Sequence, residues 1–319
     1  MTSRGRRVLA GLTVVAVAVF GAGACGSSPG HGDQITVYSG QDATLVAEWV
    51  AAFTEETGIE VVVRHGGDIG LGNRLLAEGA DSPADAFLTA NTPAMTLVAR
   101  AGLLTEVDQA TLDQVPSRYR SPANWVGVAS RATAFVYDTD QVRPAGLPAS
   151  LLDLAQPAWQ GRWGAATASS DFQAIVTGLL ALRGEDVTRA WLRGVRANAV
   201  GAPNTAATVE AVAANTPATG LIFDDAWYRA GESHGNTALH YFSGQDPGAF
   251  VSVSGAAVLA ASEKHDAAQK FLAFLTSEQA AQILAANTGG APPPATPPID
   301  PARLDPGTAL RLLAEAGLR

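Results

Sequence analysis

The feature that most constrains the fold is an alternation of short apolar strands with amphipathic helices near the start of the chain. Residues 35–38 predict a buried strand, and apolar residues at helical spacing then predict a helix that ends at Gly58. Residues 59–63 predict a second strand, which completes a strand–helix–strand unit. The pattern then repeats, with a loop at 66–70, helices at 71–78 and 93–100, and a strand at 84–88. This alternation predicts an α/β fold with a mainly parallel sheet covered by helices on both faces.

Two longer apolar stretches, at 125–138 and 249–259, are rich in β-branched and aromatic residues and contain no turn signal. Two strands that cross around an inserted segment predict a discontinuous architecture of two lobes with a cleft. We expect residues 33–130 plus 252–302 in lobe 1 and residues 131–251 plus 303–319 in lobe 2. The remaining predicted elements lie at 154–163, 172–182 and 187–195, with helices at 267–285 and 307–317 and a proline-rich connection at 289–298.

The first 24 residues have the order of a signal peptide, with arginines first, then thirteen apolar residues at 8–20 and small residues before Cys25. An apolar run of this length is too short to span a bilayer of about 30 Å as a helix. Ala-Gly-Ala before Cys25 resembles a bacterial lipobox, so we expect a lipidated Cys25 followed by a flexible tether at 25–32. The alternatives are an ordinary secretory signal with an incidental cysteine and, because of Arg6-Arg7, twin-arginine export.

Charge and cysteine content exclude several classes of function. The net charge is −9, and the first 25 residues hold three arginines and no acid, which leaves −12 on the rest. Such a surface repels phosphate backbones and argues against a nucleic-acid partner. A single cysteine excludes a disulfide framework and a cysteine-rich metal site. The five histidines lack the spacing of a metal motif, so we expect them to be structural or exposed.

Several segments, in order along nearly the whole chain after the tether, resemble the iron-type substrate-binding proteins of bacterial ABC importers. They are residues 36–41 (TVYSGQ), 53–61 (FTEETGIEV), 82–87 (SPADAF), 101–104 (AGLL), 245–259 (QDPGAFVSVSGAAVL) and 312–319 (LLAEAGLR). The resemblance implies a type II periplasmic-binding-protein-like fold, in which two α/β lobes close about a hinge on a ligand between them. It also implies an exported, monomeric receptor that passes a small-molecule or metal ligand to an ABC permease, with the membrane reached through the lipid anchor and no cofactor beyond the transported ligand.

The same resemblance implies where a ferric ion would bind. The family's ligand positions fall on Asp42, Ala90, Asp225 and Ala226, so its glutamate and both of its tyrosines are missing. Asp42 and Asp225 are therefore the metal candidates, and Asp224 stands beside Asp225 on an expected loop. The family's accessory anion site maps onto Asn91, Arg131, Ser169, Ser170 and Asn204, where Asp171 adds a negative charge.

Alternatives remain open at this stage. Asp42 opens a helix, where aspartate is a favoured N-cap, and the acids at 224 and 225 can be solvated loop residues. The ligand can be ferric iron, a ferric chelate, another small cation, or an organic cation such as a polyamine held beside Trp227 and Tyr228, which can equally be packing residues. A chain that only bridges partners is a further hypothesis. The sequence has no Gly-x-Ser-x-Gly, His-Glu-x-x-His or Walker motif, so we do not expect an enzyme.

Overall fold

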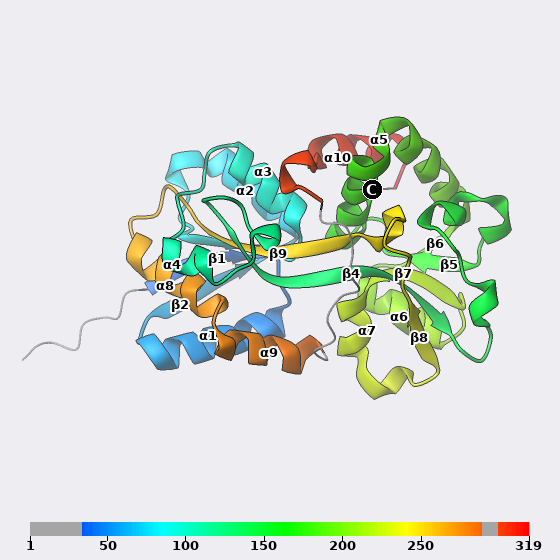
Figure 1. Ribbon diagram of the computed structural model, residues 1–319, viewed down its shortest axis with the longest axis horizontal. Coiled ribbons are helices and arrows are strands. Elements are labelled where there is room, and N and C mark those ends of the chain that lie inside the picture. Colours follow the sequence, from blue (N-terminus) through cyan, green and yellow to red (C-terminus); the bar gives the residue numbers. More distant parts are fainter. Residues whose placement is uncertain (1–33, 289–298, 319) are drawn as a thin grey trace, which may run out of the picture. The chain divides into compact units, whose positions relative to one another are not determined.

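The computed structural model describes residues 34–288 and 299–318, which belong to a compact unit at 32–319 (Figure 1). Cys25, the signal segment and the proline-rich stretch at 289–298 lie outside the described residues. The strands are β1 (Gln34–Ser39), β2 (Glu60–His65), β3 (Ala86–Leu88), β4 (Val126–Asp138), β5 (Trp163–Ala165), β6 (Ala199–Gly201), β7 (Thr219–Phe223), β8 (Thr237–His240) and β9 (Val251–Val258). The helices are α1 (Ala43–Thr57), α2 (Asp68–Glu78), α3 (Thr92–Arg100), α4 (Gln109–Asp113), α5 (Ser170–Asn198), α6 (Thr205–Ala213), α7 (Asp224–Ala230), α8 (His265–Leu275), α9 (Glu278–Thr288) and α10 (Pro306–Glu315). Among the described residues, no helix is both long enough and apolar enough to cross a membrane.

The strands form one continuous sheet in the order β2-β1-β3-β9-β4-β7-β5-β6, with β8 also paired to β4. β1 pairs in parallel with β2 and β3, and β5 pairs in parallel with β6 and β7. Every pairing that involves β4 or β9 is antiparallel. The expectation of a mainly parallel sheet is therefore wrong for the middle of the sheet, because the two long strands run in opposite directions through it.

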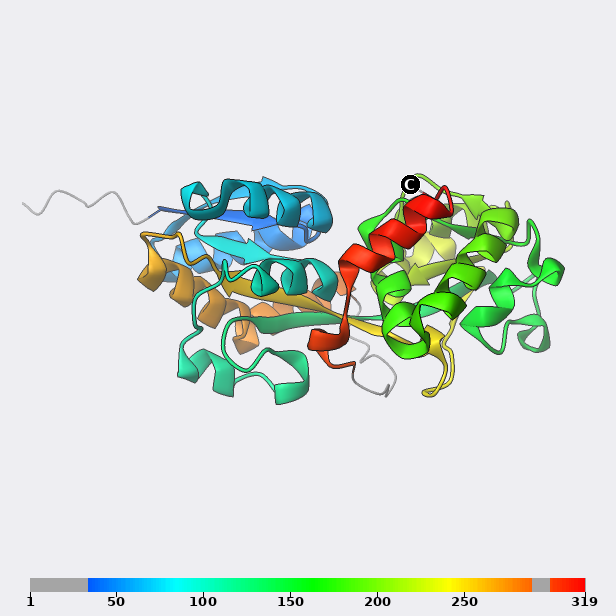
Figure 2. The same ribbon diagram turned by 90° about the horizontal axis from the view of Figure 1, so that it is seen from above.

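β4 and β9 are the two predicted crossing strands, and Figure 1 shows them running side by side between two groups of elements. We call the group around β1, β2 and β3 the first lobe and the group around β5, β6 and β7 the second lobe. Each lobe has its own apolar core, and helices cover both faces of its part of the sheet. α10 returns to the second lobe, where it packs along α5 (Figure 2).

Local sequence explains the first strand–helix–strand unit. Asp42 caps α1, because its carboxylate accepts hydrogen bonds from the backbone N–H groups of Thr44 and Leu45 at 3.0 and 3.1 Å. The helix ends at Gly58, whose φ of 72° lies in the left-handed region that glycine adopts without steric cost. The buried face of α1 carries Leu45, Val46, Trp49 and Phe53. The predicted spacing is confirmed here.

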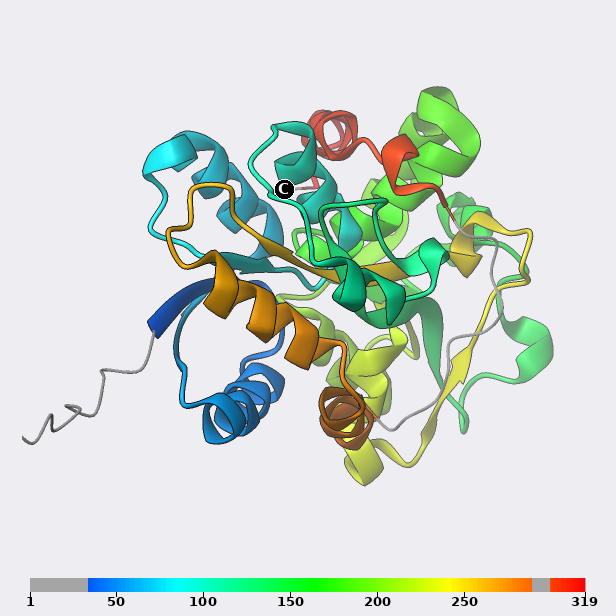
Figure 3. The same cartoon turned by 60° about the vertical axis from the view of Figure 1, so that its left-hand side comes forward.

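One predicted helix differs from the observed structure. The single helix expected at 267–285 is two helices, α8 and α9, which meet at Thr276 and Ser277. The break arises because the Ser277 hydroxyl accepts a hydrogen bond from the N–H of Ala280 at 3.2 Å and so starts a new helix. The Trp49 indole N–H then donates to the Ala280 carbonyl at 3.0 Å, which holds α9 beside α1. Figure 3 shows α9 nearly end-on, close to both α1 and α7.

Candidate functional site

Three of the predicted site residues, Arg131, Asp224 and Asp225, lie where α1, β4 and α7 approach one another. A small cavity of about 40 Å³ lies there, lined by residues that include Gln41, Arg131, Asp225, Tyr228 and Arg229. Gln41 belongs to the loop between β1 and α1, Arg131 lies on β4, and the other three lie at or on α7. Residues of both lobes and of a crossing strand therefore contribute to one cavity.

Arg131 is the centre of the polar network in this region. Its NH2 group donates to the carbonyl of Ala90 at 2.8 Å, to Oδ1 of Asn91 at 2.7 Å and to Oδ1 of Asp171 at 3.1 Å. Its NH1 group donates to Oδ2 of Asp225 at 3.4 Å. The side chain is 8% exposed, so these contacts fix a buried positive charge between the loop after β3, the start of α5 and the start of α7.

Two atoms at the cavity lack hydrogen-bond partners in the described part of the chain. They are Nε of Arg131, a donor, and Oδ1 of Asp225, an acceptor. Both residues are buried and both line the cavity. Both side chains have partners through their other atoms, so one donor, Nε of Arg131, and one acceptor, Oδ1 of Asp225, stay unused. A ligand that offers an acceptor to the first and a positive charge or a donor to the second could satisfy both.

Asp171 fills the centre of the predicted anion site. Besides Arg131, its carboxylate accepts hydrogen bonds from Nδ2 of Asn91 at 3.1 Å and from the hydroxyl of Thr205 at 2.9 Å. Burial on its own would raise the pKa of Asp171, but the Arg131 guanidinium and the hydrogen bonds from Asn91 and Thr205 hold that pKa below its usual value. The position expected to receive a free anion thus holds a carboxylate of the chain itself.

The other predicted anion ligands have separate structural roles. The Ser169 hydroxyl accepts from the N–H of Phe172 at 3.1 Å and caps α5, and Oδ1 of Asn204 accepts from the N–H of Ala207 at 2.8 Å and caps α6. Ser170 is the first residue of α5 and faces the backbone of Gly67 in the first lobe. The structure thus brings Asn91 and Arg131 together, whereas Ser169 and Asn204 cap helices.

Asp225 and Asp42 lie on either side of one arginine, Arg229. A guanidinium N–H of Arg229 donates to Oδ2 of Asp225 within α7, and Nε of Arg229 lies 4.0 Å from Oδ2 of Asp42. Asp42 therefore has two roles, because one carboxylate oxygen caps α1 while the other faces Arg229. The capping role predicted for Asp42 is confirmed, and its contact with a ligand stays a prediction.

Asp224 differs from its neighbour. The predicted loop at 224–225 is wrong, since both residues form the first turn of α7 and are 5% exposed. Oδ1 of Asp224 accepts from the N–H of Ala132 at 2.9 Å, and Oδ2 accepts from the Tyr241 hydroxyl at 3.2 Å. Burial raises the pKa of Asp224 to about 6. Both oxygens of Asp224 thus have protein partners, through which Asp224 supports the crossing strand β4 while it also lines the cavity.

Sequence reasoning missed two residues of the site, Arg229 and Asp68. Arg229 follows Asp225 by four residues, a spacing that would have placed both on one helical face had a helix been predicted there. Asp68 is 2% exposed, accepts from the N–H of Ala90 at 3.0 Å and from Nδ2 of Asn91 at 3.1 Å, and its pKa is raised to about 6 by burial. Gly40 makes room for it, because a Cβ at that position would lie 1.8 Å from Oδ1 of Asp68.

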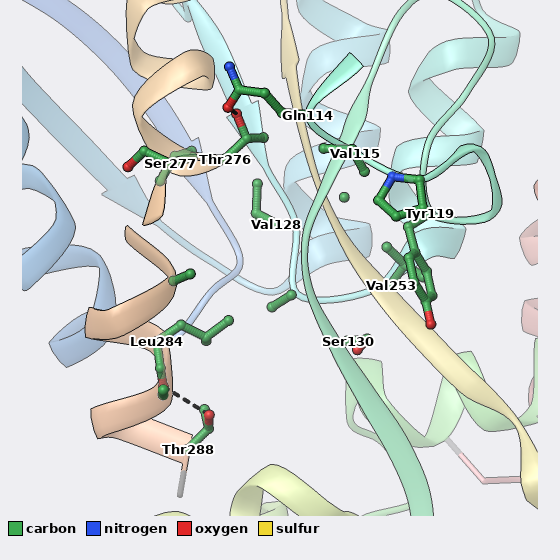
Figure 4. Close-up of a pocket in the computed structure, with 16 residues that line it drawn as sticks. Gln114, Val115, Tyr119, Val128, Ser130, Val253, Thr276, Ser277, Leu284 and Thr288 are labelled. Atoms are coloured by element: carbon green, nitrogen blue, oxygen red, sulfur yellow. Dashed lines mark hydrogen bonds between the residues drawn. The ribbon is translucent and has the colours of Figure 1, made fainter. Parts of the chain in front are cut away.

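A larger pocket of about 380 Å³ lies next to the cavity (Figure 4). Both spaces are lined by Ala129 and Ser130 of β4 and by Leu284 and Thr288 of α9. Figure 4 shows Leu284 and Thr288 facing β4 across this pocket, with Tyr119 on its far side. Among the described residues, no charged side chain lines the larger pocket.

Within residues 34–288 and 299–318, no three His, Cys, Asp or Glu side chains gather in a way that could hold a metal ion. The carboxylates of Asp42 and Asp225 face Arg229 from either side. Any cation at this place must therefore bring part of its own coordination shell.

Comparison with known proteins relates this chain to a family. Residues 81–318 match the family described as bacterial extracellular solute-binding protein. The chain is 43% identical over 322 aligned residues to the "Fe(3+)-binding periplasmic protein" of Serratia marcescens, with 94% of each chain covered. It is 31% identical to the "Major ferric iron-binding protein" of Neisseria meningitidis serogroup B, with 86% of this chain and 85% of the other covered.

Solved structures agree in fold. The iron-bound HitA of Pseudomonas aeruginosa matches with a TM-score of 0.83 at 34% identity, covering 89% of this chain and 99% of that one. A Trichodesmium protein in complex with iron and citrate ligands matches with a TM-score of 0.71 at 25% identity, covering 90% of this chain and all of that one. The predicted α/β fold of two lobes, of the type II periplasmic-binding-protein class, is confirmed.

Proposed function

The chain belongs to the family of bacterial extracellular solute-binding proteins, and we propose that it is the exported receptor of an ABC importer for iron, bound as ferric iron that carries oxygen ligands of its own. The proposal includes delivery of this ligand to a permease in the membrane. It retains the predicted division into residues 33–130 plus 252–302 and residues 131–251 plus 303–319 as the two lobes that close on the ligand.

The observation that carries this proposal is the pair of unpartnered buried atoms, Nε of Arg131 and Oδ1 of Asp225. A carboxylate oxygen is a hard ligand that suits a small, highly charged cation. A guanidinium N–H cannot bind a cation, but it can donate to an oxygen atom that is itself bound to the cation. A metal ion with an oxygen ligand, such as a hydroxide or a chelator's carboxylate, satisfies both atoms at once.

The charges around the cavity support a metal ion with its own oxygen ligands over an organic cation. The cavity of about 40 Å³ has room for roughly three atoms the size of a water molecule. A polyamine has no oxygen atom that could accept a hydrogen bond from Nε of Arg131, and its own positive charges would meet that of Arg229. Of the aromatic pair that suggested such a ligand, only Tyr228 lines the cavity, since the Trp227 indole N–H donates to the hydroxyl of Thr237 at 2.8 Å.

Two curated relatives lend the iron assignment further support, because their names state that they bind ferric iron and each matches at least 86% of this chain. The same relatives are binding proteins, so we infer that this chain acts by binding and release and not by turnover. Export follows from the predicted signal peptide, and attachment through Cys25 would keep the receptor beside its permease. We expect the receptor to act as a monomer.

The experiment is native mass spectrometry with elemental analysis of the full chain, purified from its expressing cells without added metal and then incubated with ferric citrate. We expect a mass increase that matches a single ferric ion with a bound oxygen ligand. A mass increase that matches a polyamine would contradict the proposal. So would the absence of any iron-bound species at every ferric citrate concentration.

A further inference from the structure

Arg229 lies between Asp42 and Asp225. Its guanidinium contacts the carboxylate of Asp225, and its Nε lies 4.0 Å from the carboxylate of Asp42. These two acids are the proposed metal ligands, and they come from different lobes. Arginine stays protonated in proteins, so Arg229 already supplies a positive charge between them.

Arg131 and Arg229 differ in their freedom to move. Arg131 is held by four acceptors and is 8% exposed, whereas Arg229 contacts two carboxylates and is 34% exposed. Asp42 is also 34% exposed, so the contact between Arg229 and Asp42 lies toward the solvent side of the site. Arg229 can therefore turn toward a ligand while Arg131 stays in place.

The charge of Arg229 affects different ligands in opposite ways. A hydrated cation that binds Asp225 and Asp42 must push the guanidinium away, because like charges at this distance repel in a partly buried site. A cation wrapped in a polycarboxylate presents negative oxygen atoms on its outer side. Arg229 can then exchange Asp42 for a chelator carboxylate and make the paired N–H···O contacts that arginine forms with carboxylates.

The space around the cavity fits such a complex. The cavity of about 40 Å³ holds the metal ion and a few oxygen atoms, but not a chelator. The neighbouring pocket of about 380 Å³ shares four lining residues with it and has the size of a site for a small organic molecule (Figure 4).

We propose that Arg229 determines specificity in this receptor by favouring ferric iron complexed with a polycarboxylate over a bare hydrated cation. The inference rests on the proposed iron function and names the class of ligand that the same site selects. Its distinguishing feature is that removal of one positive charge weakens the binding of the chelate and strengthens the binding of the bare cation.

The test is isothermal titration of the full chain with two probes in separate experiments, ferric citrate and manganese(II) chloride. Arg229→Gln removes the positive charge. Arg229→Lys keeps the charge but loses the planar guanidinium group, which can donate two parallel hydrogen bonds. Arg74→Gln is the matched control, because Arg74 forms the same i,i+4 contact with Glu78 on the exposed surface of α2. Thermal melting of each variant checks that the fold is kept.

We expect Arg229→Gln to bind ferric citrate at least tenfold more weakly and manganese(II) several-fold more tightly than the wild type. Arg229→Lys should fall between the wild type and Arg229→Gln for both probes, and Arg74→Gln should match the wild type. If Arg229→Gln shifts both affinities in the same direction, or neither, Arg229 does not set specificity, whether or not the protein binds iron. Absence of ferric citrate binding by the wild type would contradict the iron function itself.

Discussion

The side-chain amide of Asn91 donates to the carboxylate of Asp171 at 3.1 Å, which joins the loop after β3 in the first lobe to the first turn of α5 in the second. Arg131 and Thr205 bind the same carboxylate. Asp171 therefore acts as an anion built into the chain, at the place where the sequence resemblance implies a free phosphate or carbonate. This relationship accounts for the polar network without any added anion.

Phosphate should leave the stability of the wild-type protein unchanged at constant ionic strength, because Asp171 occupies the anion position. Asp171→Gly removes the carboxylate and leaves Arg131, Asn91 and Thr205 to bind phosphate instead. At a phosphate concentration about tenfold above its Kd, we expect the melting temperature of the variant to rise by about 2–5 °C relative to the same variant in chloride. Differential scanning calorimetry measures this shift. A phosphate-induced rise in the wild type would show that a free anion binds despite Asp171.

Asp68 makes stability depend on pH in a direction set by its raised pKa. Because burial raises the pKa to about 6, the neutral carboxyl stabilises the fold fully below about pH 4, and this contribution is lost as the pH rises through about 6. As the pH rises from 4 to 7, the unfolding free energy of Asp68→Asn should therefore increase relative to that of the wild type by about 1–3 kcal/mol. Urea unfolding at several pH values measures the difference.

Asp171→Asn serves as the control for this pH dependence. The pKa of Asp171 lies below its usual value, so its contribution is present at neutral pH and is lost only as the pH falls. The unfolding free energy of Asp171→Asn should consequently show no increase relative to that of the wild type between pH 4 and pH 7. A flat difference for Asp68→Asn over the same range would mean that Asp68 is ionised in the folded protein at low cost.

The ferric complex should lack the visible charge-transfer band of an iron-bound tyrosinate. The family's two tyrosine positions hold Asp225 and Ala226, and the nearest phenols are already engaged. Tyr38 donates to the Glu78 carboxylate at 3.0 Å, and Tyr228 shares a hydrogen bond with Tyr241, whose pKa is raised by burial. Absorption spectra of the protein with ferric citrate test this expectation. A coloured complex that fades in Tyr228→Phe would place a tyrosine among the ligands.

Cys25 should determine whether the protein stays with the membrane. Replacement of Cys25 by serine removes the thiol that a lipid would modify, so the protein should move from the membrane fraction to the medium or to the soluble periplasmic fraction. Immunoblotting of the separated fractions measures this change. Equal membrane association of the wild type and Cys25→Ser would exclude the lipid anchor.

Local patterns predicted some of the elements that build the fold. β1 and α1 follow from apolar spacing and from the cap residues Asp42 and Gly58, and β4 and β9 follow from long runs without turn residues. The break at Ser277 was missed because apolar spacing continues through it, while a single capping hydroxyl decides where α9 begins. The antiparallel direction of the crossing strands depends on chain topology, which periodicity does not encode.

The site was less predictable, because its residues meet only after folding. Asp42, Asn91, Arg131 and Asp225 were found through the family resemblance, and the structure brings them to one region. Arg229 was missed because its role depends on Asp42, which is far away in the sequence. No sequence pattern distinguishes Asp225, with a free oxygen atom, from Asp224, whose oxygens are both bonded.

The most direct test of the iron function is equilibrium dialysis of the full chain against ferric iron buffered with citrate, for the wild type and Asp225→Asn. The amide keeps an oxygen for the arginines but is a poor ligand for ferric iron, so the fold should persist while binding weakens at least about tenfold. Glu78→Gln is the control, since Glu78 contacts Arg74 with the same i,i+4 spacing and lies away from the cavity. We predict a single ferric ion per chain for the wild type and for Glu78→Gln, with the loss confined to Asp225→Asn. Iron binding that is unchanged in Asp225→Asn would contradict the account.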